Sequence, residues 1–158
     1  MMSAHSFPRQ REWLATGEQH FEEELVAGVY CRPMARRDTT RTDNMGSHIA
    51  EQILKRQGVR VEQKPQPGQM GATNAMFRRD LLVERPFDER FSAGGEDADW
   101  SKWAINTGFL IIRDPGFTVY HSHGLGPLGW MQQYREWWRN GKPEEFSREN
   151  IVYRRKNG

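Results

Sequence analysis

The chain has 158 residues, and its 23 basic and 21 acidic residues give a formal net charge of +2. This length suits one domain with a buried core, and so small a net charge excludes the strong positive field typical of nucleic-acid binding. The single cysteine, Cys31, excludes a disulfide within the chain and fits a reducing compartment. No apolar run reaches the length of a membrane span, and residues 1–11 lack the apolar centre of a signal peptide, so we expect a cytoplasmic protein.

Composition divides the chain into a disordered start over 1–10, a folded domain over 11–143 and a charged tail over 144–158. Helical spacing or composition predicts helices over residues 11–24, 47–57, 97–107 and 127–140. A single helical turn is predicted over residues 78–82. Short apolar runs rich in β-forming residues predict strands over residues 25–31, 70–77, 109–112 and 117–121. Because strands and helices are interspersed, the pattern favours an α/β or α+β layered fold.

Local signals set the boundaries of the helix predicted over 47–57. Ser47 can cap its start through its side-chain oxygen, and Gly58 can end it. The preceding segment, 34–44, is rich in arginine and threonine and is predicted to be a loop. The following segment, 59–69, contains two prolines and is predicted to be a loop or an edge strand.

A stretch of two glycines and three carboxylates opens the helix predicted over 97–107. Its members are Gly94, Gly95, Glu96, Asp97 and Asp99. Glycine lets a backbone approach a ligand closely, and carboxylates at a helix start are kept ionised by unpaired N–H groups. Such an acid can take a proton from a sugar hydroxyl or bind a metal ion. Simple capping of the helix is the alternative interpretation.

Two histidines follow on the last predicted strand. Val119, His121 and His123 occupy every second position, so they are expected on one face of that strand. Two imidazoles on one face can bind a metal ion, and a structural, hydrogen-bonded histidine is the alternative. A cupin-like His-X-His metal site is disfavoured, because such a site needs a further histidine after His123 and none follows.

Four landmarks taken together resemble the family-2 glycosyltransferases, inverting nucleotide-sugar enzymes of GT-A fold. They are the motifs G-A-T-N-A-M-F-R-R, F-D-E-R-F, G-E-D-A-D and V-Y-H-S-H, at residues 71–79, 87–91, 95–99 and 119–123. The resemblance implies an incomplete GT-A-like mixed sheet flanked by helices, of α/β class. It also implies transfer of a sugar, with inversion, from a nucleotide-sugar donor to a hydroxyl of a carbohydrate acceptor.

The resemblance further implies a role for individual residues. Asp97 corresponds to the catalytic base, and Glu96 beside it shapes the acceptor site. His121 corresponds to a ligand of a divalent metal ion, Mn²⁺ or Mg²⁺, and His123 is a second candidate ligand. The implied substrate-binding residues are Gly71, Asn74, Gly94, Gly95 and Asp99.

The chain departs from the family in two respects. Trp103 stands where an arginine is usual, so the charge partner of the acidic helix is in question. The nucleotide-binding strands and the Asp-X-Asp motif, which in the family precede a segment like 7–14, are expected to be missing. We therefore expect an acceptor-side half that forms a homodimer, pairs with a complementary chain, or is marginally stable. A non-catalytic binding or regulatory module is the alternative.

The helix predicted over 127–140 carries an apolar stripe of Leu128, Met131, Tyr134 and Trp138, which Trp130 and Trp137 widen. Such a stripe is expected to pack across a sheet. Tryptophan and arginine on one helix can also lie in a membrane interface, so peripheral contact with a membrane surface is the less favoured alternative.

Overall fold

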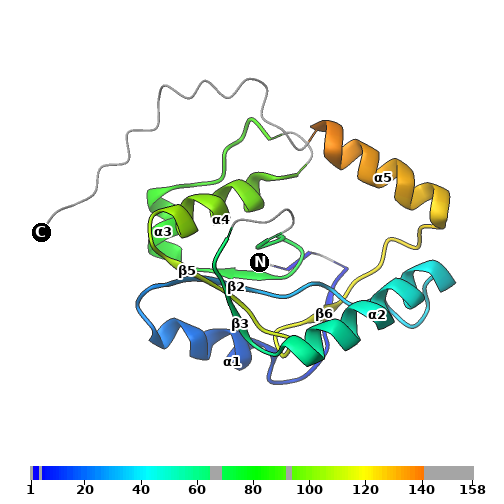
Figure 1. The fold of residues 1–158 in the computed structure, drawn as a ribbon, viewed down its shortest axis with the longest axis horizontal. Coiled ribbons are helices and arrows are strands. Elements are labelled where there is room, and N and C mark those ends of the chain that lie inside the picture. The colour runs from blue at the N-terminus through cyan, green and yellow to red at the C-terminus, as the bar shows by residue number, and fades with distance from the viewer. Residues whose placement is uncertain (1, 4, 65–68, 92–93, 141–158) are drawn as a thin grey trace, which may run out of the picture.

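The computed structural model describes residues 2–3, 5–64, 69–91 and 94–140. The elements follow in the order β1 (Phe7–Pro8), α1 (Trp13–Glu18), η1 (Gln19–Glu22), β2 (Val26–Tyr30), α2 (Arg41–Gln57), β3 (Arg60–Glu62), β4 (Ala75–Phe77), α3 (Arg79–Glu84), α4 (Glu96–Asn106), β5 (Leu110–Arg113), β6 (Val119–Tyr120) and α5 (Pro127–Asn140). Helices flank a mixed sheet, which confirms the predicted α/β class (Figure 1).

The central sheet has four strands in the order β3-β5-β2-β4. β2 and β5 are parallel, whereas β3 and β4 are antiparallel to their neighbours. Every residue of β2 is buried, which explains why this strand reads as a continuous apolar run instead of an alternating one. A separate two-stranded sheet pairs β1 with β6 in antiparallel register.

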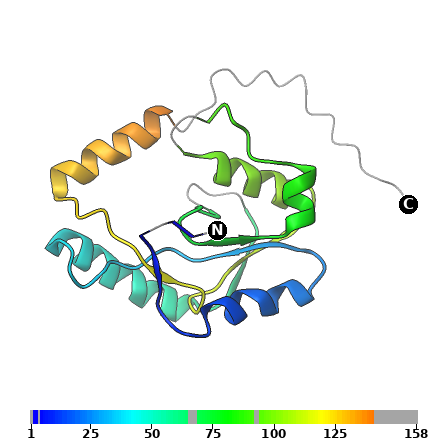
Figure 2. The same cartoon turned by 180° about the vertical axis from the view of Figure 1, so that it is seen from behind.

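The helices form a layer on each face of the sheet. α3 and α4 lie on one side, and α1 and α2 lie on the other (Figures 1 and 2). On the first side, Trp100 and Trp103 of α4 pack with Leu81 of α3 against Ala27 and Ile111 of the sheet. The spacing of the two tryptophans directs both rings to the sheet, and Gly108, with φ of 95°, follows the end of α4.

The opposite face is covered by aromatic side chains of the first helical segment. Trp13 of α1 stacks on the buried Phe117 ring with 4.7 Å between ring centroids, and Phe21 of η1 joins the same cluster. α2 contributes Leu54, which packs in a smaller cluster with Cys31. Burial raises the pKa of the Cys31 thiol to about 11, so this cysteine stays protonated and behaves as a packing residue.

Gly28 in the middle of β2 allows an unusually close side-chain contact. A Cβ at this position would lie 2.2 Å from Met70 Cε and 3.0 Å from the Met76 carbonyl oxygen. The Met70 side chain fills that space and is fully buried, although its φ of 56° lies in the left-handed region, which is costly for methionine. The packing gained over Gly28 therefore offsets backbone strain at Met70.

The side-chain amide of Asn74 connects three separate parts of the chain. Its Nδ2 donates to the carbonyl oxygens of Cys31 (3.1 Å) and Phe117 (2.7 Å), and its Oδ1 accepts from Trp13 Nε1 (3.1 Å). Asn74 is 1% exposed, so these bonds replace contacts with water. Its backbone also forms an antiparallel bridge with Met2. Asn74 thus fixes the turn before β4 against both sheets.

The start of α2 differs from the prediction. The helix begins at Arg41 and its cap is Thr40, whose Oγ1 accepts from the Asp43 backbone N–H at 3.2 Å. Ser47 lies inside the helix, where its Oγ accepts from the Ala35 N–H at 2.6 Å. Both hydroxyls suit a helix start, and the one nearer the N-terminus has the free N–H group to cap. The predicted end at Gly58 is confirmed, with φ of 62°.

The beginning of the chain also differs from the predicted disordered start. β1 pairs with β6, and Ser6 just before it is buried. Segment 59–69 contributes the edge strand β3, one of the two predicted possibilities. Strand 70–77 shortens to β4, because the residues before it form the turn that ends at Asn74. The predicted tail over 144–158 lies outside the described residues.

Replacing Asn74 with leucine tests the role of this amide. The variant keeps a similar side-chain volume but leaves the Trp13 indole N–H and two carbonyl oxygens without their partner. Each buried polar group left unpaired costs about 1–3 kcal/mol. We expect the free energy of unfolding, measured in urea, to fall by roughly 3 kcal/mol or more.

The matched control is Asn44→Leu on the exposed surface of α2, where the amide makes a single contact of 3.5 Å with the Thr39 carbonyl oxygen. Its free energy of unfolding should change by no more than about 0.5 kcal/mol. Equal losses in the two variants would contradict the assigned role of Asn74.

Candidate metal centre and acidic helix start

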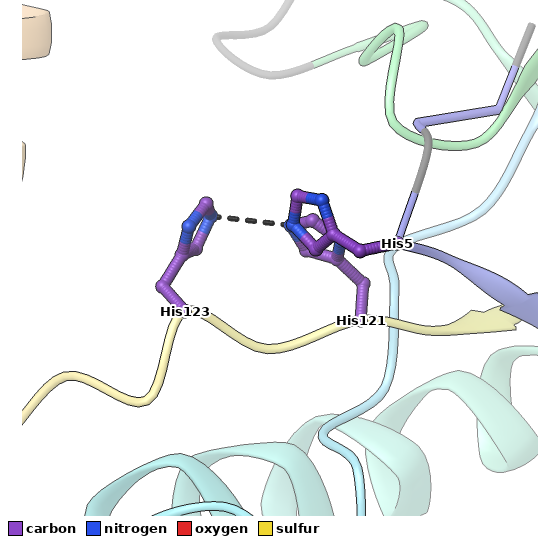
Figure 3. Close-up of side chains that lie close together, drawn as sticks. All are labelled: His5, His121 and His123. Atoms are coloured by element: carbon purple, nitrogen blue, oxygen red, sulfur yellow. Dashed lines mark hydrogen bonds between the residues drawn. The ribbon is translucent and has the colours of Figure 1, made fainter.

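Three histidines from distant parts of the chain converge beside the two-stranded sheet (Figure 3). One ligating nitrogen of each of His5, His121 and His123 lies within 4.8 Å of the other two. His121 Nε2 and His123 Nε2 are 3.2 Å apart, and the rings of His5 and His121 stack with centroids 4.4 Å apart. These three residues, called the histidine cluster below, include both histidines predicted as metal ligands.

The pairing of β1 with β6 explains the convergence. Phe7 pairs with Tyr120 and Pro8 with Val119, so the residues just before β1 run alongside the residues just after β6. The backbone N–H of His121 donates to the Met34 carbonyl oxygen at 2.8 Å, which holds the segment after β6 in place. His121 and His123 therefore lie beyond the strand, whereas the sequence predicted that strand to extend to His121.

Two serine hydroxyls contact the ring nitrogen of His121 that faces away from His123. His121 Nδ1 lies 3.1 Å from Ser6 Oγ and 3.3 Å from Ser3 Oγ, and the two hydroxyls are 2.6 Å apart. A hydroxyl can both accept and donate, so Ser6 can accept from Nδ1–H while it donates to Ser3. In that arrangement Nε2 of His121 carries the lone pair, which faces His123 Nε2 at 3.2 Å.

The environment of His121 keeps its ring neutral. Burial is the main cause that lowers its pKa to about 4, and the neighbouring His123 and His5 rings lower it further. A neutral imidazole is the form that binds a metal ion.

One wall of the histidine cluster is formed by α5. The ring of Trp130 meets that of His123 edge-on, with centroids 5.8 Å apart, and its Nε1 donates to Oδ1 of the buried Asp43. The predicted packing stripe points elsewhere, because Leu128, Met131 and Tyr134 are exposed. Trp130 faces inward because both its ring and its N–H find partners there. The side chain of Trp138, the fourth member of the stripe, lies outside the described residues.

The acidic stretch opens α4 as predicted, and its carboxylates have distinct partners. Gly95 precedes the helix with φ of 112°, a left-handed value that glycine adopts without strain. Asp97 Oδ2 accepts from the Ala72 backbone N–H at 3.0 Å, and its Oδ1 accepts from the Ala98 N–H at 2.7 Å. Glu96 Oε2 is buried and has no hydrogen-bond partner among the described residues.

The remaining predicted site residues divide between open space and structural contacts. A Cβ on Gly94 would meet nothing within 4 Å, so space is open beside this residue. Gly71 lies in the turn before β4, where its carbonyl oxygen accepts from the Asn74 N–H. Asn74 uses its amide within the core, and Asp99 pairs with Arg85 Nη2 at 2.6 Å. The amide of Asn74 is therefore fully engaged within the core, and one oxygen of Asp99 is engaged by Arg85.

Arg85 is the charge partner that the sequence left in question. Besides its ion pair with Asp99, its guanidinium lies over the Trp103 ring, 5.5 Å from the centroid. Its carbonyl oxygen also accepts from Trp100 Nε1 at 2.8 Å. Trp103 therefore adds packing to α4 while an arginine from the end of α3 supplies the charge.

The acidic helix start and the histidine cluster are connected by hydrogen bonds. Asp97 holds the N–H of Ala72, and the carbonyl oxygen of the next residue, Thr73, accepts from the Ser3 N–H at 3.2 Å. Ser3 Oγ in turn contacts His121 Nδ1. Three hydrogen bonds, through Ala72–Thr73 and Ser3, thus connect Asp97 to His121.

His5 is the site residue that the sequence did not reveal. It comes to the histidine cluster through a strand of two residues, which is too short to show an alternating pattern. The residues flanking it, Ser3 and Ser6, are small and polar and read equally well as a disordered start.

The donor atoms of the cluster can be compared with the metal ion that the resemblance implies. All three are imidazole nitrogens. Mg²⁺ requires oxygen ligands in an octahedral arrangement, and Mn²⁺ prefers carboxylate, carbonyl and water oxygens. Among the described residues, no carboxylate joins the three imidazoles in this group of potential ligands. The histidine cluster therefore does not fit Mg²⁺ or Mn²⁺.

Comparison of the chain with protein-family models, curated proteins and solved structures finds no match. Along the described ranges, no helix combines the length and apolar character needed to cross a membrane.

The pH dependence of stability tests the neutral state of His121. The folded protein keeps this ring unprotonated down to pH about 4, whereas the unfolded chain takes up the proton near the ordinary pKa of 6.5. Protons therefore favour the unfolded chain in this window. With a chelator present, we expect the contribution of His121 to lower the free energy of unfolding as the pH falls from 6.5 to about 4, and to vanish above that window.

The measurement is urea unfolding at several pH values for the wild type, His121→Gln and His48→Gln. The free energy of unfolding of His121→Gln should decline less steeply below pH 6.5. His48, an exposed histidine of α2, is the control and should leave the profile unchanged. Identical profiles for wild type and His121→Gln would contradict the neutral state.

Proposed function

We propose that this chain is a glycosyltransferase-like protein that presents the acceptor side of an inverting, GT-A-like active site. The observation that carries the proposal is the hydrogen-bonded path from Asp97 through Ala72, Thr73 and Ser3 to His121. It connects the two groups to which the resemblance assigns a function. The mixed sheet with helices on both faces is compatible with this architecture.

Asp97 is the base in this proposal. The N–H groups of Ala72 and Ala98 donate to its side-chain oxygens, and each of these oxygens keeps a second lone pair. In the transfer step an acceptor hydroxyl gives its proton to Asp97 while its oxygen bonds to the anomeric carbon. The bond from that carbon to the nucleotide diphosphate breaks, and the electron pair leaves with the diphosphate.

Glu96 and Gly94 would form the acceptor side of the pocket. The unpartnered Oε2 of Glu96 can accept a hydrogen bond from a sugar hydroxyl, which would satisfy a buried oxygen. The space beside Gly94 is open, so an acceptor could approach the start of α4 there. Asn74, Gly71 and Asp99 act indirectly in this proposal, because they hold the turn and the helix that border the pocket.

The open edges of the central sheet favour the binding of a partner chain. β3 and β4 are the outer strands, and along the described residues the outer side of β4 meets only the bridge from Met2. Val59 and Val61 are exposed beside and within β3. Unpaired strand edges with exposed apolar side chains favour pairing with another strand. A second copy, or a chain that binds the nucleotide-sugar donor, would satisfy either edge.

A non-catalytic carbohydrate-binding or regulatory module is the second candidate. It is favoured by the two backbone N–H groups on Asp97, which is also the arrangement of a purely structural helix cap. In this case the chain binds an acceptor sugar without transferring anything to it.

Asp97→Asn separates these candidates. The amide oxygen can still accept from the Ala72 N–H, so the fold should persist, but the base is lost. General-base catalysis contributes roughly 10²- to 10⁴-fold, so we expect transfer to fall by about 100-fold or more. The assay is run on a full-length enzyme that includes a donor-binding half, and it follows release of nucleoside diphosphate from UDP-, GDP- and dTDP-sugars in the presence of oligosaccharide acceptors, with thermal unfolding as the folding check.

Asp80→Asn on α3 is the matched control, because Asp80 is an exposed acid beside Arg78 and should leave transfer unchanged. Full transfer by Asp97→Asn would exclude Asp97 as the base. Oligosaccharide binding without transfer, in wild type and variant alike, would favour the binding module.

A further inference from the structure

We propose that His5, His121 and His123 form a zinc centre, which binds Zn²⁺ in preference to Mn²⁺ and Mg²⁺, in which three imidazoles bind the ion and a fourth position stays open to an exchangeable ligand. The inference is independent of sugar transfer and rests on the disagreement between this donor set and an Mg²⁺ or Mn²⁺ site.

The spacing of two ring nitrogens already suits the ion. Zinc is bound by imidazole at about 2.0–2.1 Å, so two ligands of a tetrahedral ion are roughly 3.3–3.4 Å apart. His121 Nε2 and His123 Nε2 are 3.2 Å apart. The separation of the two nitrogens therefore matches that of two ligands of one zinc ion, and binding would replace the contact between them with two bonds to the metal.

The third ligand is held nearby with freedom to turn. His5 is exposed and is stacked on His121 with an angle of 30° between the rings. Its ligating nitrogen lies within 4.8 Å of the other two, so a change of side-chain rotamer suffices to complete the set. β1 limits the movement of its backbone, because Phe7 is fixed opposite Tyr120.

The surrounding hydroxyls orient the central ligand. A metal-bound histidine usually donates its other ring N–H to a neighbouring acceptor, and that bond fixes both ring orientation and tautomer. Ser6 Oγ lies 3.1 Å from His121 Nδ1 and is buried, so it can accept that bond without competition from water. Ser6 is therefore a positioning residue for the metal site.

The chemistry of the ligands decides between metal ions. Imidazole suits zinc and its neighbours among the transition metals, and affinity for nitrogen ligands rises from Mn²⁺ towards Cu²⁺ and Zn²⁺. Three protein ligands with one open position are the pattern of a zinc site that exchanges a bound water or substrate. The Trp130 ring beside His123 shields one side of the site.

The test is calorimetric titration of the full chain, prepared without a polyhistidine tag, with Zn²⁺, Mn²⁺ and Mg²⁺ and no nucleotide sugar. We expect one Zn²⁺ per chain, bound roughly 100-fold or more tightly than Mn²⁺. Co²⁺ should give the visible absorption of a tetrahedral site. Mn²⁺ or Mg²⁺ binding as tight as that of Zn²⁺ would overturn the inference.

Variants assign the ligands. His5→Gln and His123→Gln change exposed side chains and should each weaken zinc binding strongly, as should His121→Gln, whereas His48→Gln should not. Ser6→Ala should weaken zinc binding by about 10-fold, because loss of an outer-sphere partner costs 10- to 100-fold. Ser101→Ala, a buried serine bonded to Gln69, is its control. Unchanged zinc affinity in His5→Gln and His123→Gln would overturn the assignment even if His121→Gln fails to fold.

Discussion

The geometry of both candidate sites depends on the buried amide of Asn74. This single side chain accepts a hydrogen bond from Trp13 of α1 and donates to two carbonyl oxygens. These belong to Cys31, directly after β2, and to Phe117, in the segment before β6. The turn that precedes it then has a fixed position, from which Ala72 reaches Asp97 and Thr73 reaches Ser3. A side chain that the sequence suggested as a substrate contact is instead the support on which the acidic helix and the start of the chain are aligned.

Helix bounds that depend on residues close together in the sequence were predicted well for α4 and α5. The tryptophan spacing and the glycines at either end located α4 to within a residue, and α5 has the predicted bounds. In α4 the periodicity of the tryptophans agrees with the glycines at either end, so local chemistry is sufficient to define this helix. The start of α2 was misjudged because two hydroxyls, Thr40 and Ser47, are both capable of capping, and tertiary contact with Ala35 decides between them.

Features that depend on distant pairing could not be predicted. His5 joins the histidine cluster through two residues of strand, and Arg85 meets Asp99 because α3 and α4 pack side by side. Neither partnership leaves a periodic signal in the sequence. The resemblance indicated His121 and His123 as candidate metal ligands, and the structure adds a third imidazole, that of His5. With a third imidazole and two hydroxyls around them, the ligand set differs from the oxygen-rich one that Mg²⁺ and Mn²⁺ prefer.

The contact between Gly28 and Met70 has a consequence for sequence variation. A methyl group at position 28 would overlap the end of the Met70 side chain, and the adjacent Met76 carbonyl oxygen leaves no room on the other side. Any chain that keeps this sheet while gaining a larger residue at 28 must shorten the one at 70. These two positions, 42 residues apart in the numbering, are therefore expected to change together during evolution.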